Sequence, residues 1–155
     1  ALTEHDLEAY FKILQSTISG FPYFLFSKDR DLEPGEVEPE STARERTYHM
    51  MLLSLFKGMG FSVAAEVPTS RGSIDLVIQL PSTTYVIEVK LNRNAALALA
   101  QIHAKGYHKA FLGQGKTVVL LGLNFSSKAR NIDTWEAELL DAQGQSTRFI
   151  RPAGE

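Results

Sequence analysis

Two adjacent runs of mostly aliphatic residues, 73–80 and 84–90, most constrain what this chain can fold into. Each run has the length and the Val and Ile content of a β-strand, and the connection between them is short enough for an antiparallel pair. Charged side chains interrupt the runs at Asp75, Glu88 and Lys90. Because a charge inside an apolar strand costs free energy unless a partner compensates it, these residues predict a charged site on the sheet.

Alternation along the second run puts Glu88 and Lys90 on one face of the strand and Val89 on the other. Pairing with the first run would bring Asp75 beside Glu88. Two adjacent carboxylates repel each other, and they bind Mg²⁺ or Mn²⁺ well because these hard cations prefer oxygen ligands. A lysine beside such an ion can orient a water molecule or meet the charge of a phosphorane-like transition state. The pattern therefore indicates metal-dependent hydrolysis of phosphodiester bonds.

The same three residues have a simpler interpretation. Glu88 and Lys90 can form a salt bridge at an exposed strand end, and the pattern Asp…Glu-x-Lys is short and common. A chance motif in an unrelated α/β domain is a further alternative, and it requires Asp75 and Glu88 to lie more than about 8 Å apart, too far for one ion to bridge.

Hydrophobic periodicity predicts the other elements. We expect helices over residues 2–19, 41–58 and 94–110, strands over 61–66, 73–80, 84–90 and 116–125, a final hairpin of 132–141 with 146–150, and an exposed acidic loop over 27–40. The helix over 94–110 lies between two apolar strands, which implies a crossover to a parallel neighbour. The order α-α-β-β-β-α-β-β-β predicts an α/β fold with a mixed sheet flanked by helices.

Composition bounds the class of protein. The 155 residues suffice for a single domain over 1–155, with 44% hydrophobic and 22% charged residues. The absence of cysteine excludes disulfides and thiolate metal sites and is compatible with the cytoplasm, where we expect the protein. No apolar run approaches the length of a membrane span, so we expect no membrane partner. The chain begins without Met or a secretory signal, and we expect it to be excised from a longer protein.

Charge is distributed unevenly along the chain. The net charge is −2, but residues 1–60 hold six basic and ten acidic side chains, whereas residues 61–155 hold ten basic and eight acidic ones. Glu66, Asp75 and Glu88 are three of those eight acids. If a metal ion neutralised them, the second half of the chain would present a basic face suited to nucleic acid.

Several segments together resemble the PD-(D/E)XK nuclease superfamily, and in particular its branch found C-terminal to an AAA-ATPase-like domain. The matching segments are 45–49, 66–77, 85–90, 98–107 and 122–128, within a resemblance that extends from about residue 21 to residue 135. The resemblance implies a restriction-endonuclease-like core, a Mg²⁺ or Mn²⁺ cofactor and DNA as the substrate, with RNA also compatible. It further implies an ATPase-like domain in the full-length protein and is compatible with a homodimer.

The resemblance also implies roles for individual residues. Asp75 and Glu88 match the metal ligands, the backbone carbonyl of Val89 matches a further ligand, and Lys90 matches the cation that orients the water. Ile74 stands where the motif has proline, a change without chemical consequence because proline carries no ligand. Glu45 matches an acid that binds the metal directly or through water; its alternative is a favourable charge at a helix N-terminus.

The helix that follows the catalytic strand carries three further candidates, Gln101, Lys105 and Tyr107. Gln101 and Lys105 share a face because they lie four residues apart. The superfamily uses a Gln and a Tyr here to touch the metal site or the DNA backbone, but in this chain the usual Tyr position is Lys105. Tyr107 does not align with Gln101 on a helix, and a place in the core is as good an interpretation of it.

Three candidates flank these motifs. Arg71 has a guanidinium suited to gripping a phosphate, or to balancing Glu66, and Glu66 either lies near the metal or pairs with Arg71. Lys128 and the nearby Arg130 either contact backbone phosphates or belong to a solvated loop.

Two functions remain open. The first is a metal-dependent DNA nuclease. The second is a catalytically silent module of the same fold that binds nucleic acid or docks onto a partner ATPase domain.

Overall fold

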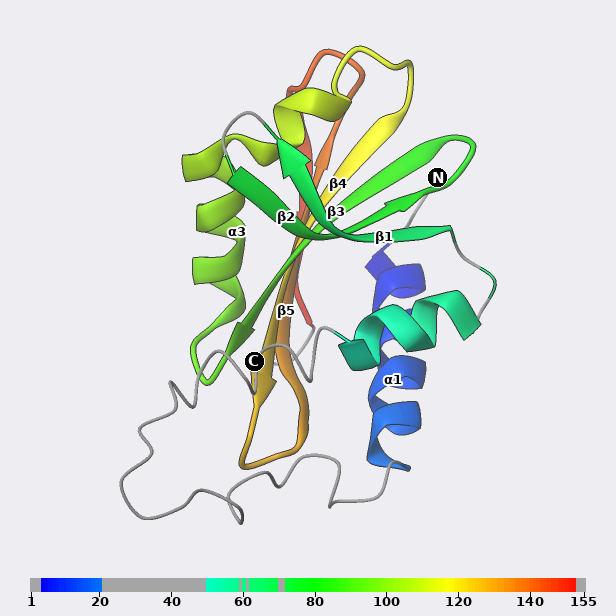
Figure 1. Ribbon diagram of the computed structural model, residues 1–155, viewed down its shortest axis with the longest axis vertical. Coiled ribbons are helices and arrows are strands. Elements are labelled where there is room, and N and C mark those ends of the chain that lie inside the picture. The colour runs from blue at the N-terminus through cyan, green and yellow to red at the C-terminus, as the bar shows by residue number, and fades with distance from the viewer. Residues whose placement is uncertain (1–3, 21–49, 59, 61, 70–71, 153–155) are drawn as a thin grey trace.

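The computed structural model of this chain describes residues 4–20, 50–58, 60, 62–69 and 72–152, with the backbone alone described at 4–6, 65–69 and 72–74. A twisted sheet forms its centre, with helices on both faces (Figure 1). This arrangement confirms the predicted α/β fold with a mixed sheet, and it is consistent with a restriction-endonuclease-like core.

The sheet has six strands in the order in which they occur in the sequence. They are β1 (Val63–Thr69), β2 (Gly72–Gln79), β3 (Thr83–Leu91), β4 (Thr117–Ser126), β5 (Asn131–Leu140) and β6 (Ser146–Ile150). Strands β3 and β4 are parallel and all other neighbours are antiparallel. The predicted meander, crossover and final hairpin are therefore confirmed.

Helix α1 (Glu4–Ser19) and a helical segment over residues 50–58 cover one face of the sheet. The apolar stripe of α1 packs on β5, where the rings of Phe11 and Trp135 stack with their centroids 4.5 Å apart. Tyr10 stacks on Phe56 of the helical segment, and its burial raises its pKa above the ordinary tyrosine value. Trp135 is thus a core residue, with 3% of its surface exposed.

Helix α3 (Ala95–Lys105) and the 3₁₀ helix η2 (Tyr107–Phe111) cover the opposite face. The Asn94 side chain caps α3 by accepting a 2.8 Å hydrogen bond from the N–H of Leu97. The helix reaches unusually close to β4 at Gly122. A Cβ atom at Gly122 would overlap the carbonyl oxygen of Ala95 and would lie 3.0 Å from the amide nitrogen of Leu99. Only glycine allows this approach.

Several predicted boundaries were wrong. The first strand was expected to end at residue 66, but β1 continues to Thr69, which pairs with Gly72 of β2. The helix predicted over 94–110 ends at Lys105. Gly106 adopts a left-handed conformation with φ 66° and donates to the carbonyl of Ile102, which ends α3 and begins η2.

The predicted helix over 41–58 is described only from residue 50, and the acidic loop over 27–40 lies outside the described residues. Within the part of the chain that the structure describes, no helix combines the length and the apolar character that crossing a membrane requires.

Gly122→Ala should destabilise the protein. The added methyl group forces α3 away from β4, and overpacking of this kind costs about 1–3 kcal/mol of unfolding free energy. Urea denaturation followed by circular dichroism measures the loss. Gly58→Ala is the control, because nothing lies within 4 Å of a Cβ at Gly58. Equal stability of the two variants would contradict the close packing of α3.

Stability should fall as the pH drops below about 6.5, partly through His108. Burial and the neighbouring His103 lower the pKa of His108, which is also near Lys109 and Glu138. Between the unfolded value of 6.5 and the lower folded value, the unfolded chain binds a proton that the folded chain does not, so acid favours unfolding. His108→Leu should therefore reduce the pH dependence of the unfolding free energy between pH 7 and 5. Identical slopes for both proteins would contradict this.

Candidate functional site

The register of β2 and β3 brings the two predicted acids together. Leu76 pairs with Ile87 and Val77 pairs with Val86 at the end of the ladder, and extending this antiparallel register by one residue brings Asp75 level with Glu88. Directly opposed residues of an antiparallel pair share a face and have Cα atoms about 4.5–5.5 Å apart. Val77, two residues from Asp75, and Val86, two residues from Glu88, both pack in the cluster beneath α3, so the two acids share the face of the sheet that α3 covers, as the metal-site prediction requires.

The ladder between β1 and β2 adds a third acid at the same level. Ala65 pairs with Leu76 and Val67 pairs with Ile74, which sets the backbone of Glu66 opposite that of Asp75. The Glu66 side chain lies outside the described atoms. Glu66, Asp75 and Glu88 thus occupy corresponding positions on three neighbouring strands.

Asp75 is anchored to the backbone of β3. Its Oδ2 accepts a 2.9 Å hydrogen bond from the N–H of Val89. The Val89 side chain points into the core on the other face of the sheet, so only its backbone belongs to this site. The bond holds the half-buried Asp75 carboxylate beside β3, next to Glu88.

Glu88 is buried, with only 4% of its surface exposed. This burial rules out the interpretation of Glu88 and Lys90 as an exposed strand end. A buried carboxylate requires compensating contacts. Gln101 of α3 supplies one of them, because its Nε2 donates a 2.5 Å hydrogen bond to Glu88 Oε1.

Gln101 also binds Lys90, whose Nζ donates to Gln101 Oε1. The chemistry of the partners fixes the orientation of the amide: an ammonium group only donates and a carboxylate only accepts, so the oxygen of Gln101 must face Lys90 and its nitrogen must face Glu88. One side chain of α3 therefore links the carboxylate and the ammonium group on β3, and sets the position of Lys90 relative to Glu88.

This arrangement fits a hard divalent cation. The donor set consists of carboxylate oxygens on adjacent strands, with a lysine at the same face two residues along β3. Among the described side chains, no group of three His, Cys, Asp or Glu residues surrounds a common point. Further ligands would have to come from the carbonyl of Val89, from water, or from Glu45 and Glu66, whose side chains lie outside the description.

The other predicted residues fall into three groups: buried, exposed and outside the described residues. Tyr107 is buried with 5% exposure in the core beneath α3 and η2, which agrees with the core interpretation. Lys105 is exposed at the end of α3, and Lys128 is exposed in the turn between β4 and β5. Glu45 and Arg71 lie outside the described residues.

Sequence reasoning missed Asn124, a buried polar residue level with Lys90 in the neighbouring strand β4. Its Oδ1 accepts a 2.9 Å hydrogen bond from the N–H of Arg93, and its Nδ2 donates a 2.7 Å bond to Asp133 Oδ1. Asn124 thereby ties the segment after β3 to β5. An amide in the otherwise apolar run 117–125 was the available signal, because a buried polar group needs partners.

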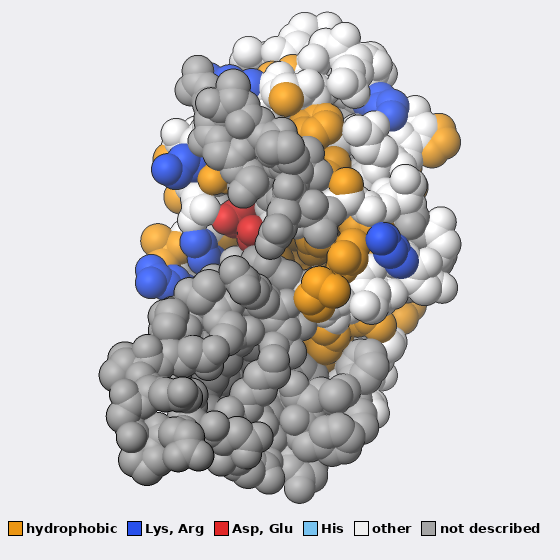
Figure 2. Space-filling model, viewed as in Figure 1, with side chains coloured by type: hydrophobic (Ala, Val, Ile, Leu, Met, Phe, Trp, Pro, Cys, Tyr) orange, Lys and Arg blue, Asp and Glu red, His pale blue; other side chains and the backbone are white. Residues whose placement is uncertain are grey.

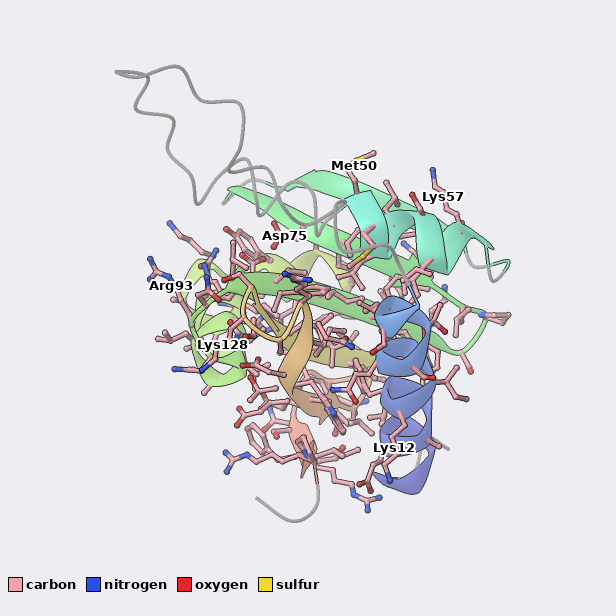
Figure 3. The ribbon with its side chains drawn as sticks, turned by 90° about the horizontal axis from the view of Figure 1, so that it is seen from below. Lys12, Met50, Lys57, Asp75, Arg93 and Lys128 are labelled. Carbon is pink, nitrogen blue, oxygen red and sulfur yellow. The ribbon has the colours of Figure 1, made fainter. Side chains whose placement is uncertain are left out.

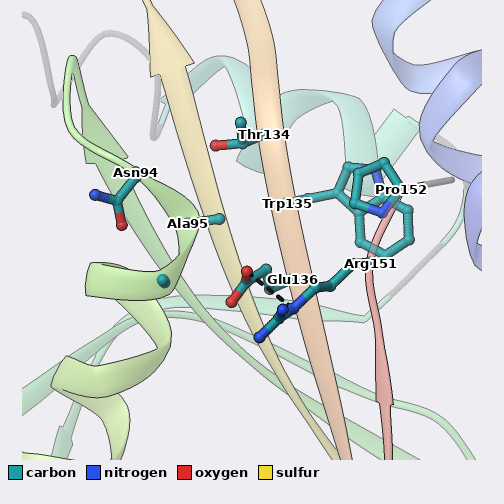
Figure 4. A pocket seen from close by; sticks show the side chains of 8 residues that line it. Asn94, Ala95, Thr134, Trp135, Glu136, Arg151 and Pro152 are labelled. Carbon is teal, nitrogen blue, oxygen red and sulfur yellow. Dashed lines mark ion pairs between the residues drawn. The ribbon is translucent and has the colours of Figure 1, made fainter. Parts of the chain in front are cut away.

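Figure 2 shows one face of the molecule, on which a small group of acidic side-chain atoms has Lys and Arg side chains nearby. A separate cavity of about 340 Å³ lies beside the first turn of α3, lined in part by Thr134, Trp135 and Pro152 (Figure 4). Glu136 in this cavity pairs with Arg151 at 3.1 Å, so its carboxylate is already neutralised. The cavity therefore lacks the adjacent carboxylates that distinguish Asp75 and Glu88.

Comparison with known proteins agrees with this geometry. The chain is 32% identical over 98 residues to an uncharacterized protein in the vnfD 5′ region of Azotobacter chroococcum mcd 1. That match covers 62% of this chain but only 19% of the relative, so the chain spans about a fifth of the relative's length. Residues 43–135, more than half of the chain and including the acids, Lys90 and Gln101, match a family model of nucleases. The chain belongs to the PD-(D/E)XK nuclease superfamily.

Proposed function

We propose that this chain hydrolyses phosphodiester bonds of DNA with the help of a divalent cation, Mg²⁺ or Mn²⁺. The observation that carries the proposal is the alignment of Asp75 with Glu88 on one face of the sheet, with Lys90 held beside them by Gln101. Membership of a nuclease superfamily supports a nuclease-type function.

Each residue has a distinct role in this proposal. Asp75 and Glu88 would hold the cation, which when bound polarises a phosphoryl oxygen and lowers the pKa of a water molecule. Lys90 has an ammonium group that can orient the attacking water and offset negative charge that develops on the phosphoryl oxygens. The Val89 carbonyl and Glu45 complete the proposed ligand set, and Glu66 is a further candidate because its backbone is level with Asp75.

Gln101 acts as a positioning residue rather than as a ligand. Its amide accepts from Lys90 and donates to Glu88, so it keeps the ammonium group from collapsing onto the carboxylate. A lysine paired directly with Glu88 would compete with the cation for the same oxygens. The bridge therefore leaves the carboxylate oriented for a metal ion and holds Lys90 beside it.

The second candidate function is a catalytically silent module of the nuclease fold. The observation that favours it is the acidic balance of the sequence, with a net charge of −2 and ten acidic against six basic side chains in residues 1–60. Such a module would bind nucleic acid or dock onto an ATPase-like domain. That domain, a homodimer and RNA as an alternative substrate remain predictions for the full-length protein.

Asp75→Asn and Lys90→Met should each lower DNA cleavage about 100-fold or more, because each removes a charge that acts on the reacting phosphate. The measurement is cleavage of plasmid and linear duplex DNA with Mg²⁺ or Mn²⁺. Glu136→Gln is the matched control, since Glu136 is a partly buried acid on the same sheet that pairs with Arg151. Asp75→Asn should also abolish Mn²⁺ binding in calorimetry.

Equal cleavage by the wild type and both variants would exclude the assignment of these residues. If the wild type neither cleaves DNA nor binds Mn²⁺ but still binds duplex DNA after Glu88→Gln, the silent module is the correct function.

Gln101→Leu should lower kcat about 10-fold to 100-fold, because the lost hydrogen bonds to charged groups are worth about 1.5–3 kcal/mol. The KM for DNA should stay unchanged, since the DNA-binding surface is intact. Gln143→Leu, the same change at an exposed glutamine in the turn between β5 and β6, is the control. A loss of kcat that merely follows a loss of unfolding free energy would contradict the positioning role.

A further inference from the structure

We propose that the two loops at the carboxyl ends of β3 and β4 form a preorganised surface for the sugar-phosphate backbone of DNA, with Arg93 and Lys128 as its phosphate contacts. The surface consists of residues 92–94 and 127–130 and is called the loop platform below. The inference rests on the proposed function in one respect: it assumes that the ligand of these loops is the same DNA that the site at Asp75 and Glu88 would cleave.

Parallel pairing brings the two loops together. Leu91 at the end of β3 lies opposite Phe125 near the end of β4, so the segments that follow both strands leave the same edge of the sheet. Figure 3 views the molecule from below, toward this edge. Arg93 and Lys128 project from the left of that view, whereas Lys12 and Lys57 lie on the right.

Hydrogen bonds between Asn92 and Ser127 join the loops. Asn92 Oδ1 accepts a 2.9 Å bond from the N–H of Ser127, and Asn92 Nδ2 donates a 2.9 Å bond to Ser127 Oγ. The N–H of Asn92 also donates to the carbonyl of Phe125 at 2.8 Å. Asn92 adopts φ 54°, a left-handed conformation that asparagine tolerates better than most residues. This residue therefore ties the backbone of one loop to that of the other.

The backbone around each charge is also fixed. The N–H of Arg93 donates to the buried Asn124 at 2.9 Å, and the N–H of Ala129, next to Lys128, donates to Ser126 Oγ at 3.0 Å. A surface whose backbone is ordered before binding loses less conformational entropy when a ligand arrives. The backbone of the loop platform is thus held in place by hydrogen bonds before any ligand binds.

The charges are available to a ligand. Arg93 and Lys128 are exposed, and neither forms an ion pair with another described residue. Two cations on fixed backbone next to each other suit the repeating charges of a nucleic-acid backbone.

The position of Arg93 links the loop platform to the acid site. Arg93 follows Lys90 by three residues, so at most about 11 Å of extended chain separates them. A DNA strand carries one phosphate per about 3.4 Å of helix axis, and its phosphates lie farther apart than this rise because the strand winds around the axis, so about 11 Å reaches a neighbouring phosphate. A strand gripped at Arg93 would therefore present a neighbouring phosphate to Lys90 and Glu88.

The test measures binding without hydrolysis. Fluorescence anisotropy of a labelled duplex is recorded in EDTA over a series of salt concentrations for Arg93→Ala and Lys128→Ala. Each variant should weaken binding about 3-fold to 10-fold and lower the slope of log K against log salt by about one, as expected for one lost phosphate contact. Lys12→Ala and Lys57→Ala, exposed lysines on the other side of the molecule, should change neither quantity.

A further variant tests the preorganisation. Asn92→Gly removes the side chain that joins the loops but tolerates the same φ and keeps every charge. It should weaken DNA binding about 3-fold or more while leaving the salt slope unchanged, because the number of phosphate contacts stays the same. A wild-type affinity for this variant would overturn the preorganised platform.

Three other results would overturn the proposal: no salt-dependent binding of DNA by the wild type, equal losses in the Lys12 and Lys57 variants, or losses on vesicles with phosphatidylserine but not on DNA. Because EDTA prevents metal-dependent cleavage, the binding result does not depend on the cleavage assay. Loss of cleavage in Asp75→Asn with intact DNA binding would support the nuclease whatever the loop variants do.

Discussion

The close contact between α3 and β4 at Gly122 is the constraint on which the rest of this structure depends. Because residue 122 has no side chain, the backbone of α3 at Ala95 and Leu99 can lie directly on the sheet. The helix is then near enough to β3 for Gln101 to reach Glu88 and Lys90. A larger residue would lift the helix, and the amide would no longer link the two charges.

Helix α3 connects β3 to β4, and this crossover connection positions both the metal site and the loop platform. It makes β3 and β4 parallel, so the segments after Leu91 and Phe125 lie side by side and can be joined through Asn92. The hairpin of β2 and β3 contributes the acids. Strand β3 therefore takes part in both proposed sites. It carries Glu88 and Lys90 of the metal site, and its end leads into the loop that is joined to the loop after β4.

The burial of Glu88 determines how much its negative charge must be compensated. Glu88 is almost inaccessible to water, so an isolated negative charge there would be strongly unfavourable. Its hydrogen bond to Gln101 supplies part of the compensation, and Asp75 next to it increases the demand for positive charge. A divalent cation would meet that demand with the oxygen ligands it prefers, and this is the physical basis for treating the acids as a metal site.

The sequence by itself determined the order of the elements, the antiparallel meander, the parallel crossover and the shared face of Asp75, Glu88 and Lys90. These features follow from period-two alternation and from short connections, which are local properties. It did not determine that α3 ends at Lys105, before the left-handed Gly106, so that Tyr107 lies outside the helix and in the core. Nor did it determine the contacts of Gln101, Asn92 and Asn124. Those depend on how closely separate segments approach, and only the packing of α3 on the sheet and the pairing of β3 with β4 decide that distance.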